Sequence, residues 1–586
     1  MLPPVPERAL TELGRTEGGP ETLGLLVRDQ HTRRLLLLRA VLDAAEAADP
    51  RVLPAAALAR LHADWALLEE AERLERAARR ARRSAGPGPG AMRPSRAGAG
   101  EAGLFGGVFG PAGGAVPEPM PERPARGADG PVSGPSAGRP TRDADAVVAE
   151  RLAGRFTGDE HRRVTADRAP SPPRPPHRTR HDTSAPALPG PPPTGVRSLL
   201  LHPFTGPWAR DALRGLDTVT GPSAERDLRE PARALAHFGA LAAVAAVRAG
   251  VSCAVRLSAR DGVLTLPSLG ALRTGRPGDT EVSLVHRRGR LTFRRPGEAD
   301  VVVQVQSGVG AWSEAAAWTP AYALPGLLPG SPSVPLDDLD PYRTARGGPR
   351  PHTLSGPVTL DDADRKHWLH AWSGTAAALG LGGERRLTEA AALLRCLVPL
   401  SPPAGAVPGR AGGSCSGTRR EAFGAVLSST PATATAFAAT LVHEIQHTKL
   451  AALSDMVTLH HAGTEARHFA PWRPDPRPYD GLLQGAYSHL ALADFFQRTA
   501  LTTPNPAHRD AAWARHARYQ EQVGAVLPAL VGSGDLTPRG RQFVDRLVET
   551  YERLAEQPAP RGQAARATAY VRAARTLWTQ RHTPGR

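Results

Sequence analysis

Apolar residues recur with helical spacing over most of this chain. Two such stretches, residues 20–48 and 54–83, follow one another near the N-terminus, and Pro54 suits a first helical turn. Each has a stripe of leucines along one side. A hairpin of two helices cannot bury both stripes by itself, so we expect it to dock on a later part of the chain.

The apolar pattern stops after the second helix. Residues 85–193 are rich in Gly, Pro and Arg. Such a segment has too little apolar surface to offset the entropy of ordering it. We predict that it is a disordered linker that takes no part in chemistry.

Helical and alternating patterns are mixed beyond the linker. A helix is predicted over residues 230–250, and strands with alternating apolar positions at 252–257, 262–266, 281–286, 290–294 and 300–305. Further helices are predicted at residues 363–379, 386–398, 432–462, 481–500, 507–530 and 539–556, with one more strand at 422–428.

This order of elements predicts an α+β protein, mostly helical, with a small mixed or antiparallel sheet and a long disordered insertion. A strand directly before the helix at 432–462 is also the arrangement of zincin-like folds. We expect four parts: a docking helical hairpin (1–84), the linker (85–193), an α+β subdomain (194–350) and a mainly helical subdomain (351–586).

The chain is basic, with 73 Lys and Arg against 57 Asp and Glu among 586 residues, for a formal charge of +16. Only Lys366 and Lys449 are lysines, so the surplus is arginine, as in GC-rich bacterial genomes. The densest basic run, residues 73–83, is typical of a solvated helix end. The charge is therefore weak evidence for a nucleic-acid partner, and we do not expect one.

Membrane insertion and export are not expected. The N-terminus lacks the apolar core of a signal peptide, and no stretch approaches 18 uninterrupted apolar residues. The three cysteines, Cys253, Cys396 and Cys415, have no CxxC spacing and are expected to be reduced thiols. These features predict a cytoplasmic protein.

The strongest chemical signal is the pentapeptide His443-Glu444-Ile445-Gln446-His447. On a helix, positions i and i+4 lie one above the other, so both imidazoles can bind one divalent metal. Glu444 lies beside them, close enough to handle a proton on a metal-bound water. We therefore predict a metal site in residues 351–586, which makes this part the expected catalytic subdomain.

A catalytic metal needs a third protein ligand. The metzincin spacing is excluded, because Leu453 stands where that class has its third histidine. The best candidate is His489, which recurs with apolar residues on the buried face of the helix at 481–500 and needs a partner for its nitrogens. A main-chain carbonyl could satisfy it instead, and Tyr487 or His468 could approach the site. Asp494 is a possible acceptor for His489.

A proline-rich segment connects the two helices that carry these histidines. Its arginines include Arg467 and Arg473, and Trp472 adds an aromatic surface. A guanidinium above a metal site would bind the distal carboxylate of an acidic cosubstrate such as 2-oxoglutarate. The alternative is an ordinary surface loop with solvated arginines.

Several of these segments closely resemble the actinobacterial HEXXH-motif domain family. They are residues 440–450 (TLVHEIQHTKL), 469–478 (FAPWRPDPRP), 481–487 (GLLQGAY), 338–343 (DLDPYR) and 422–424 (AFG), with the apolar helix around 35–38. The family's members are described as putative peptide-modifying proteins and as 2-oxoglutarate-dependent peptide β-hydroxylases. They occur beside radical-SAM maturases of ribosomally made peptides.

The resemblance implies an Fe(II) and 2-oxoglutarate-dependent enzyme that hydroxylates a side chain of a precursor peptide. It also implies a separate radical-SAM maturase as a partner, with His443, His447 and His489 as iron ligands. Spacing alone fits a zinc metallopeptidase with Glu444 as general base equally well. A non-catalytic peptide-binding module with a structural metal is the third possibility.

Overall fold

The computed structural model describes residues 5–84, 195–217, 229–345, 355–403 and 415–582. Contacts group residues 5–81 and the described residues from 195 onward into one compact unit. The predicted linker, residues 85–193, lies outside the described residues. Within them, no helix is long and apolar enough to cross a membrane.

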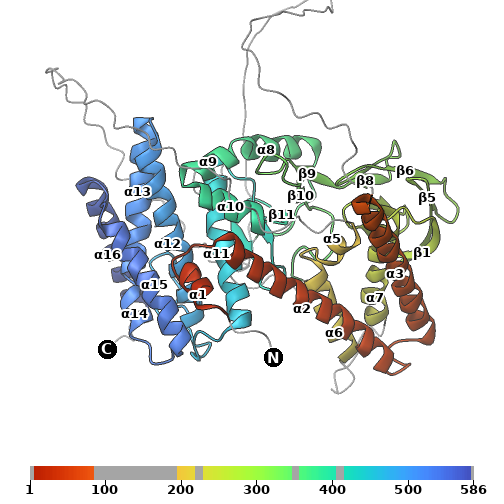
Figure 1. Ribbon diagram of the computed structural model, residues 1–586, viewed down its shortest axis with the longest axis horizontal. Coiled ribbons are helices and arrows are strands. Elements are labelled where there is room, and N and C mark those ends of the chain that lie inside the picture. Colours follow the sequence, from red (N-terminus) through yellow and green to blue (C-terminus); the bar gives the residue numbers. More distant parts are fainter. Residues whose placement is uncertain (1–4, 85–194, 218–228, 346–354, 404–414, 583–586) are drawn as a thin grey trace, which may run out of the picture. The chain divides into compact units, whose positions relative to one another are not determined.

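Helices account for most of the described residues (Figure 1). They are α1 (Glu7–Gly14), α2 (Pro20–Ala47), α3 (Ala55–Ser84), α5 (Val196–Leu200), α6 (Thr205–Asp217), α7 (Glu230–Arg248), α8 (Asp362–Ser373), α9 (Thr375–Leu381), α10 (Glu384–Leu393), α11 (Ala434–Met456), α12 (Tyr479–Thr502), α13 (Pro506–Gly524), α14 (Leu527–Val531), α15 (Pro538–Ala555) and α16 (Arg561–His582).

The strands form three small sheets. They are β1 (Cys253–Ala259), β2 (Val263–Leu266), β3 (Gly270–Arg273), β4 (Thr280–Arg287), β5 (Arg290–Arg294), β6 (Val301–Val305), β7 (Ala311–Trp312), β8 (Trp318–Pro320), β9 (Tyr322–Leu324), β10 (Val334–Leu336), β11 (Cys396–Pro399), β12 (Ser416–Thr418) and β13 (Ala425–Ser428). Two sheets are antiparallel, with strand orders β1-β4-β5-β6-β7 and β2-β3-β8. The third is mixed, with the order β12-β13-β11-β10-β9.

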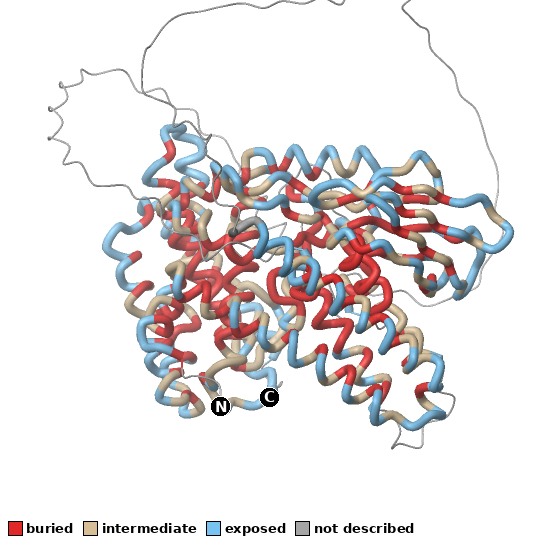
Figure 2. The backbone as a smooth tube through the Cα atoms, turned by 45° about the vertical axis from the view of Figure 1, so that its right-hand side comes forward, coloured by how far each residue is buried: buried red, intermediate tan, exposed pale blue. Residues whose placement is uncertain are grey.

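The mixed sheet has apolar residues on both faces. In β11, Leu397 belongs to the hydrophobic core that contains α11 and α12, whereas Cys396 and Val398 belong to the core that contains α7 and the antiparallel sheets. Alternate residues of a strand point to opposite faces, so this sheet lies between the two cores. In Figure 2 the interior strands and helices are largely buried, and exposed residues lie on outer turns.

The helix with the histidine motif is held on several sides. Thr433 caps α11 by accepting a hydrogen bond from the Ala436 N–H. The helix packs against α12, α9 and α2, and α2 also packs against α6. The two histidine-bearing helices, α11 and α12, lie side by side in Figure 1.

The predicted fold class, mostly helical with small mixed and antiparallel sheets, is confirmed. The expected strand before the motif helix is β13, an interior strand, and the described edge strand beside α11 is β12. The helix predicted at 386–398 is wrong beyond residue 393, because the chain turns into β11. The helix predicted at 432–462 ends at Met456, and His460 instead forms a β-bridge with Leu536.

Candidate metal centre

The two motif histidines face one another on α11. The Nε2 atoms of His443 and His447 are 3.0 Å apart, and their ring planes are nearly perpendicular. Two nitrogens that share one ion at about 2.0–2.1 Å each lie roughly 3 Å apart. The pair therefore has the separation of two donors to one metal.

Gln484, from the neighbouring helix α12, fixes the orientation of one imidazole. Its side-chain Oε1 lies 3.1 Å from Nδ1 of His447. An amide oxygen only accepts, so Nδ1 of His447 carries the proton and Nε2 presents its lone pair. A second group that holds the tautomer in this way is typical of metal-binding histidines.

Glu444 lies beside the pair and is held from the edge strand. Its Oε1 is 4.0 Å from Nε2 of His443 and accepts a hydrogen bond of 2.7 Å from the Ser416 hydroxyl. Its Oε2 is buried without a hydrogen-bond partner. Burial raises the pKa of Glu444, and His447 and the hydroxyls of Ser416 and Thr418 offset only part of that rise.

His489 comes from α12 and lies close to the pair. Its ring centroid is 5.6 Å from that of His443, and the residue is buried at 7% exposure. Its Nδ1 is buried without a hydrogen-bond partner. Trp472 packs edge-on against the ring at 4.5 Å between centroids, and Tyr519 of α13 lies at 5.2 Å.

A glycine makes this packing possible. A Cβ at Gly485 would lie 2.4 Å from the Trp472 ring, which is closer than packed atoms can approach. Glycine at this position of α12 therefore lets Trp472 lie against the helix one turn before His489. The proline-rich segment reaches the site through this tryptophan.

The surroundings keep two of these imidazoles neutral. Burial, together with the charges of His447 and His489, holds the pKa of His443 well below its ordinary value. Burial, followed by the charges of His447 and Arg518, lowers the pKa of His489 to about 3. Neutral imidazoles are the form that binds metals.

The donor set remains incomplete. In the ranges that the structure describes, no three His, Cys, Asp or Glu side chains are arranged as a group that could hold a metal ion. The structure brings His443, Glu444, His447 and His489 close together. Of these, His443 and His447 form a two-donor pair. The residues fit a metal through this pair, and His489 or Glu444 would have to come closer to complete a set of three.

The two arginines expected to hold an acidic cosubstrate are engaged elsewhere. Arg473 donates to Asp475 at 3.0 Å, and the exposed Arg467 lies 3.7 Å from Glu465. Neither forms a hydrogen bond with the three histidines. Arg518 of α13 is the arginine whose charge lowers the pKa of His489, and Arg420 lines a cleft of about 10 Å³ beside His447. Neither Arg518 nor Arg420 was predicted near the histidines, because their positions depend on the packing of segments that are distant in the sequence.

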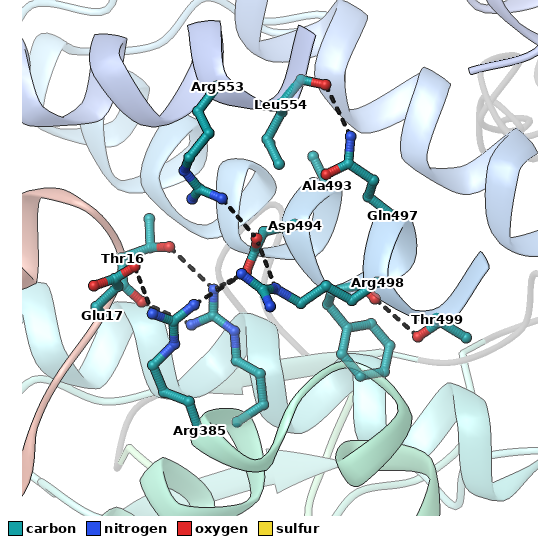
Figure 3. A network of polar contacts seen from close by, with 12 residues as sticks. Thr16, Glu17, Arg385, Ala493, Asp494, Gln497, Arg498, Thr499, Arg553 and Leu554 are labelled. Carbon is teal, nitrogen blue, oxygen red and sulfur yellow. Dashed lines mark hydrogen bonds and ion pairs between the residues drawn. The ribbon is translucent and has the colours of Figure 1, made fainter. Parts of the chain in front are cut away.

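The other groups considered for the site have structural partners. The Tyr487 hydroxyl donates to the Leu13 carbonyl, and the main chain of His468 pairs with Arg477. Asp494 does not accept from Nδ1 of His489, which has no partner. Instead it lies in a network of arginines, shown in Figure 3.

The network around Asp494 is buried and charged. Its carboxylate lies 3.1 Å from both Arg386 and Arg498, and 3.7 Å from both Arg385 and Arg553. Glu389 extends it by pairing with Arg386 and with Lys449, whose ammonium also donates to the Thr16 carbonyl.

Comparisons with known proteins add no assignment. A scan against protein-family models and a search of curated proteins both gave no match.

Proposed function

We propose that the chain is a metal-dependent enzyme that hydroxylates the β-carbon of a side chain in a ribosomally made peptide, with Fe(II) and 2-oxoglutarate. The observation that carries the metal is the His443–His447 pair, with Nε2 atoms 3.0 Å apart and one tautomer fixed by Gln484. The resemblance of residues 440–450, 469–478 and 481–487 to peptide-modifying HEXXH proteins supports the iron and the cosubstrate.

The protein's own groups would bind the metal and leave room for the cosubstrate. His443 and His447 supply two neutral nitrogens, and His489 or Glu444 is the candidate third donor. Non-haem iron oxygenases use two histidines, one carboxylate and open positions. When bound, iron and 2-oxoglutarate would let O₂ act as the oxidant, with one oxygen atom going to the peptide and the other to the succinate that forms with CO₂ from 2-oxoglutarate.

The acidic cosubstrate needs a cation for its distal carboxylate. Arg473 and Arg467 remain candidates from the proline-rich segment, and Arg473 would have to leave Asp475. Arg518 is a third candidate, because its charge already acts on His489. Its guanidinium also donates to the Tyr570 hydroxyl at 3.0 Å.

A peptide substrate has a suitable surface beside the site. Among the described strands, β12 is at the edge of the mixed sheet, and its Ser416 contacts Glu444. An extended peptide can pair with such an edge through its main chain. A separate radical-SAM maturase acting on the same precursor is the partner that the resemblance implies.

A zinc metallopeptidase is the second candidate function. The position of Glu444 favours it, since Oε1 lies 4.0 Å from Nε2 of His443 and Oε2 has no partner. A general base on a metal-bound water needs this kind of proximity. An edge strand would serve a peptide substrate in the same way.

Anaerobic purification, metal analysis and a 2-oxoglutarate titration test the proposal. We expect stoichiometric iron, formation of succinate, and a gain of one oxygen atom in a peptide incubated with O₂. His443→Ala and His447→Ala should each abolish stoichiometric metal binding, because loss of one imidazole from a three-ligand site leaves too few donors. His461→Ala, at an exposed histidine outside the site, is the control.

The Glu444→Gln variant distinguishes the two enzymes. A peptidase should keep its zinc and lose cleavage, because only the base is gone. Protein that holds only zinc, ignores 2-oxoglutarate and cleaves peptides would replace the hydroxylase with the peptidase. Protein in which both histidine variants keep the metal would overturn the site itself.

A further inference from the structure

A cavity of about 470 Å³ lies away from the candidate metal centre, and none of its lining residues belongs to that centre. It is enclosed by α2, α5, the turn between β2 and β3, the segment from β9 through residue 340, and the end of α10. Small-molecule sites have volumes of roughly 300–1,000 Å³.

Much of its wall is apolar. Leu199, Leu327, Leu336 and Leu394 line it, together with the ring of Tyr322. All four leucines belong to the two hydrophobic cores, so they are held in place by packing. A ligand with a hydrocarbon part would cover this wall.

One cation on the wall has no partner. The Arg395 side chain lines the cavity and forms no hydrogen bond or ion pair with any described residue. A Cβ on Gly424 would lie only 2.7 Å from Cγ of Arg395, and Gly424 has a φ of +91°. Glycine there leaves room for the arginine stem. The unpaired head group is thus placed by the fold.

The positive charge around Arg395 is not neutralised by acids. Arg34, just behind the wall, donates only to the main-chain carbonyls of Leu201 and Phe423. Arg248, on the wall, also donates only to carbonyls and a hydroxyl, from Gln306 and Ser268. Burial, together with the charges of Arg395 and Arg210, lowers the pKa of Arg34 to about 9.

Asp337 and Asp338, which also line the cavity, accept hydrogen bonds from the main chain. Asp337 accepts from the N–H groups of Leu339 and Asp340, and Asp338 accepts from the N–H of Leu360. These bonds hold the segment rigid and turn its charge toward the main chain. None of these carboxylates is ion-paired with Arg395.

We propose that this cavity binds a small amphipathic organic anion, with its acid group on Arg395 and its hydrocarbon part against the leucines. A carboxylate or phosphate would pair with the planar guanidinium through two hydrogen bonds. The ligand would supply the acidic partner that Arg395 lacks among the described residues.

Calorimetric titration of the full chain tests the proposal, with EDTA present so that the metal centre takes no part. The probes are octanoate, octyl phosphate and octanol, which share one hydrocarbon chain. We expect an anion to bind at least about tenfold more tightly than octanol, since charge-assisted pairs are the stronger ones. The preferred anion identifies the head group.

Two variants locate the binding. Arg395→Gln should weaken anion binding at least about tenfold while the circular dichroism spectrum stays unchanged. Ala391→Trp, which fills the cavity and keeps the arginine, should weaken all three probes. Arg214→Gln, at an exposed arginine on α6, should change nothing. No binding, equal binding of octanol, or binding untouched by Arg395→Gln would overturn the proposal.

Discussion

Two buried polar regions lie close together in the chain, and they differ in how their groups are paired. Around Asp494, every charged side chain has a partner of opposite charge, and the unpaired atoms there are the Nε of Arg385 and Arg386, whose other nitrogens are paired. In and beside the motif, Oε2 of Glu444, both amide atoms of Gln446 and Nδ1 of His489 are buried without partners. Paired groups stabilise a fold, whereas unpaired ones cost about 1–3 kcal/mol each unless a ligand satisfies them.

The difference distinguishes groups that stabilise the fold from groups that are available to a ligand. Asp494 and His489 lie on the same helix, five residues apart in number, yet one is committed to arginines and the other is not. Unsatisfied buried polar groups need an explanation, and a bound ligand is one. Four experiments test this contrast.

The largest effect is expected from Asp494→Ala. It would leave Arg386 buried with one of its two acidic partners gone, which should destabilise the protein by about 3–5 kcal/mol. Burial alone would raise the pKa of Asp494, but the arginines hold it below its ordinary value. The stabilisation is therefore present above the ordinary pKa and is lost as pH falls. Denaturant unfolding at pH 7 and pH 3 measures the destabilisation by Asp494→Ala and its dependence on pH. An equal loss of unfolding free energy at the two pH values would contradict the network.

Gln484→Ala should act on the metal and leave the fold nearly unchanged. Without the amide oxygen, Nδ1 of His447 loses the partner that fixes its tautomer. Metal affinity should fall by about 10–100-fold. A competition titration with a chelator measures it, and Gln542→Ala, an exposed glutamine on α15, is the control. Unchanged affinity would mean that Gln484 is only a packing residue.

Asp64 offers a smaller test in the other core. It lies on α3 against Gly239 of α7, and burial raises its pKa to about 7, partly offset by Arg60. The folded protein thus binds a proton that the unfolded chain releases, so stability falls as pH rises from about 4 to 7. Asp64→Asn should raise the melting temperature at pH 8 and leave it unchanged at pH 4. A variant that is less stable at pH 8 would refute the assignment.

The smallest effect is expected at the surface pair Arg15–Glu549, which joins the end of α1 to α15 at 3.1 Å. Both side chains are about four-tenths exposed, so solvent screens the attraction. Glu549→Ala should change the free energy of unfolding by less than about 1 kcal/mol. A loss comparable to that of Asp494→Ala would show that burial does not explain the contrast.

Periodic helices could be predicted from the sequence, and isolated apolar runs could not. Residues 20–48 and 539–556 were predicted within one residue of α2 and α15. Residues 394–398 contain almost no polar position, so their pattern cannot distinguish a strand from a buried helix. Short strands such as β9 and β10 have too few residues to show any period.

The site was predictable only as far as one helix determines it. The spacing of His443 and His447 predicted that their side chains meet, and they do. Gln484 is 37 residues from its partner His447, and Ser416 is 28 residues from its partner Glu444. Both contacts therefore depend on tertiary packing. Arg473 forms an ion pair with Asp475, only two residues further on. Neither the cosubstrate prediction nor the solvated-loop alternative included this local pair.

The turn at Thr16 also affects how the chain is made. Its carbonyl accepts from both Arg386 and Lys449, and its hydroxyl accepts from Arg386. At about 5–20 residues per second, the ribosome needs roughly half a minute or more to reach Asp494, which completes this cluster. The helix against which α1 packs most, α15, is made later still, and α1 contacts α2 to a smaller extent. We expect the leucines of the segment from Glu7 to Thr16 to stay accessible to a chaperone during synthesis.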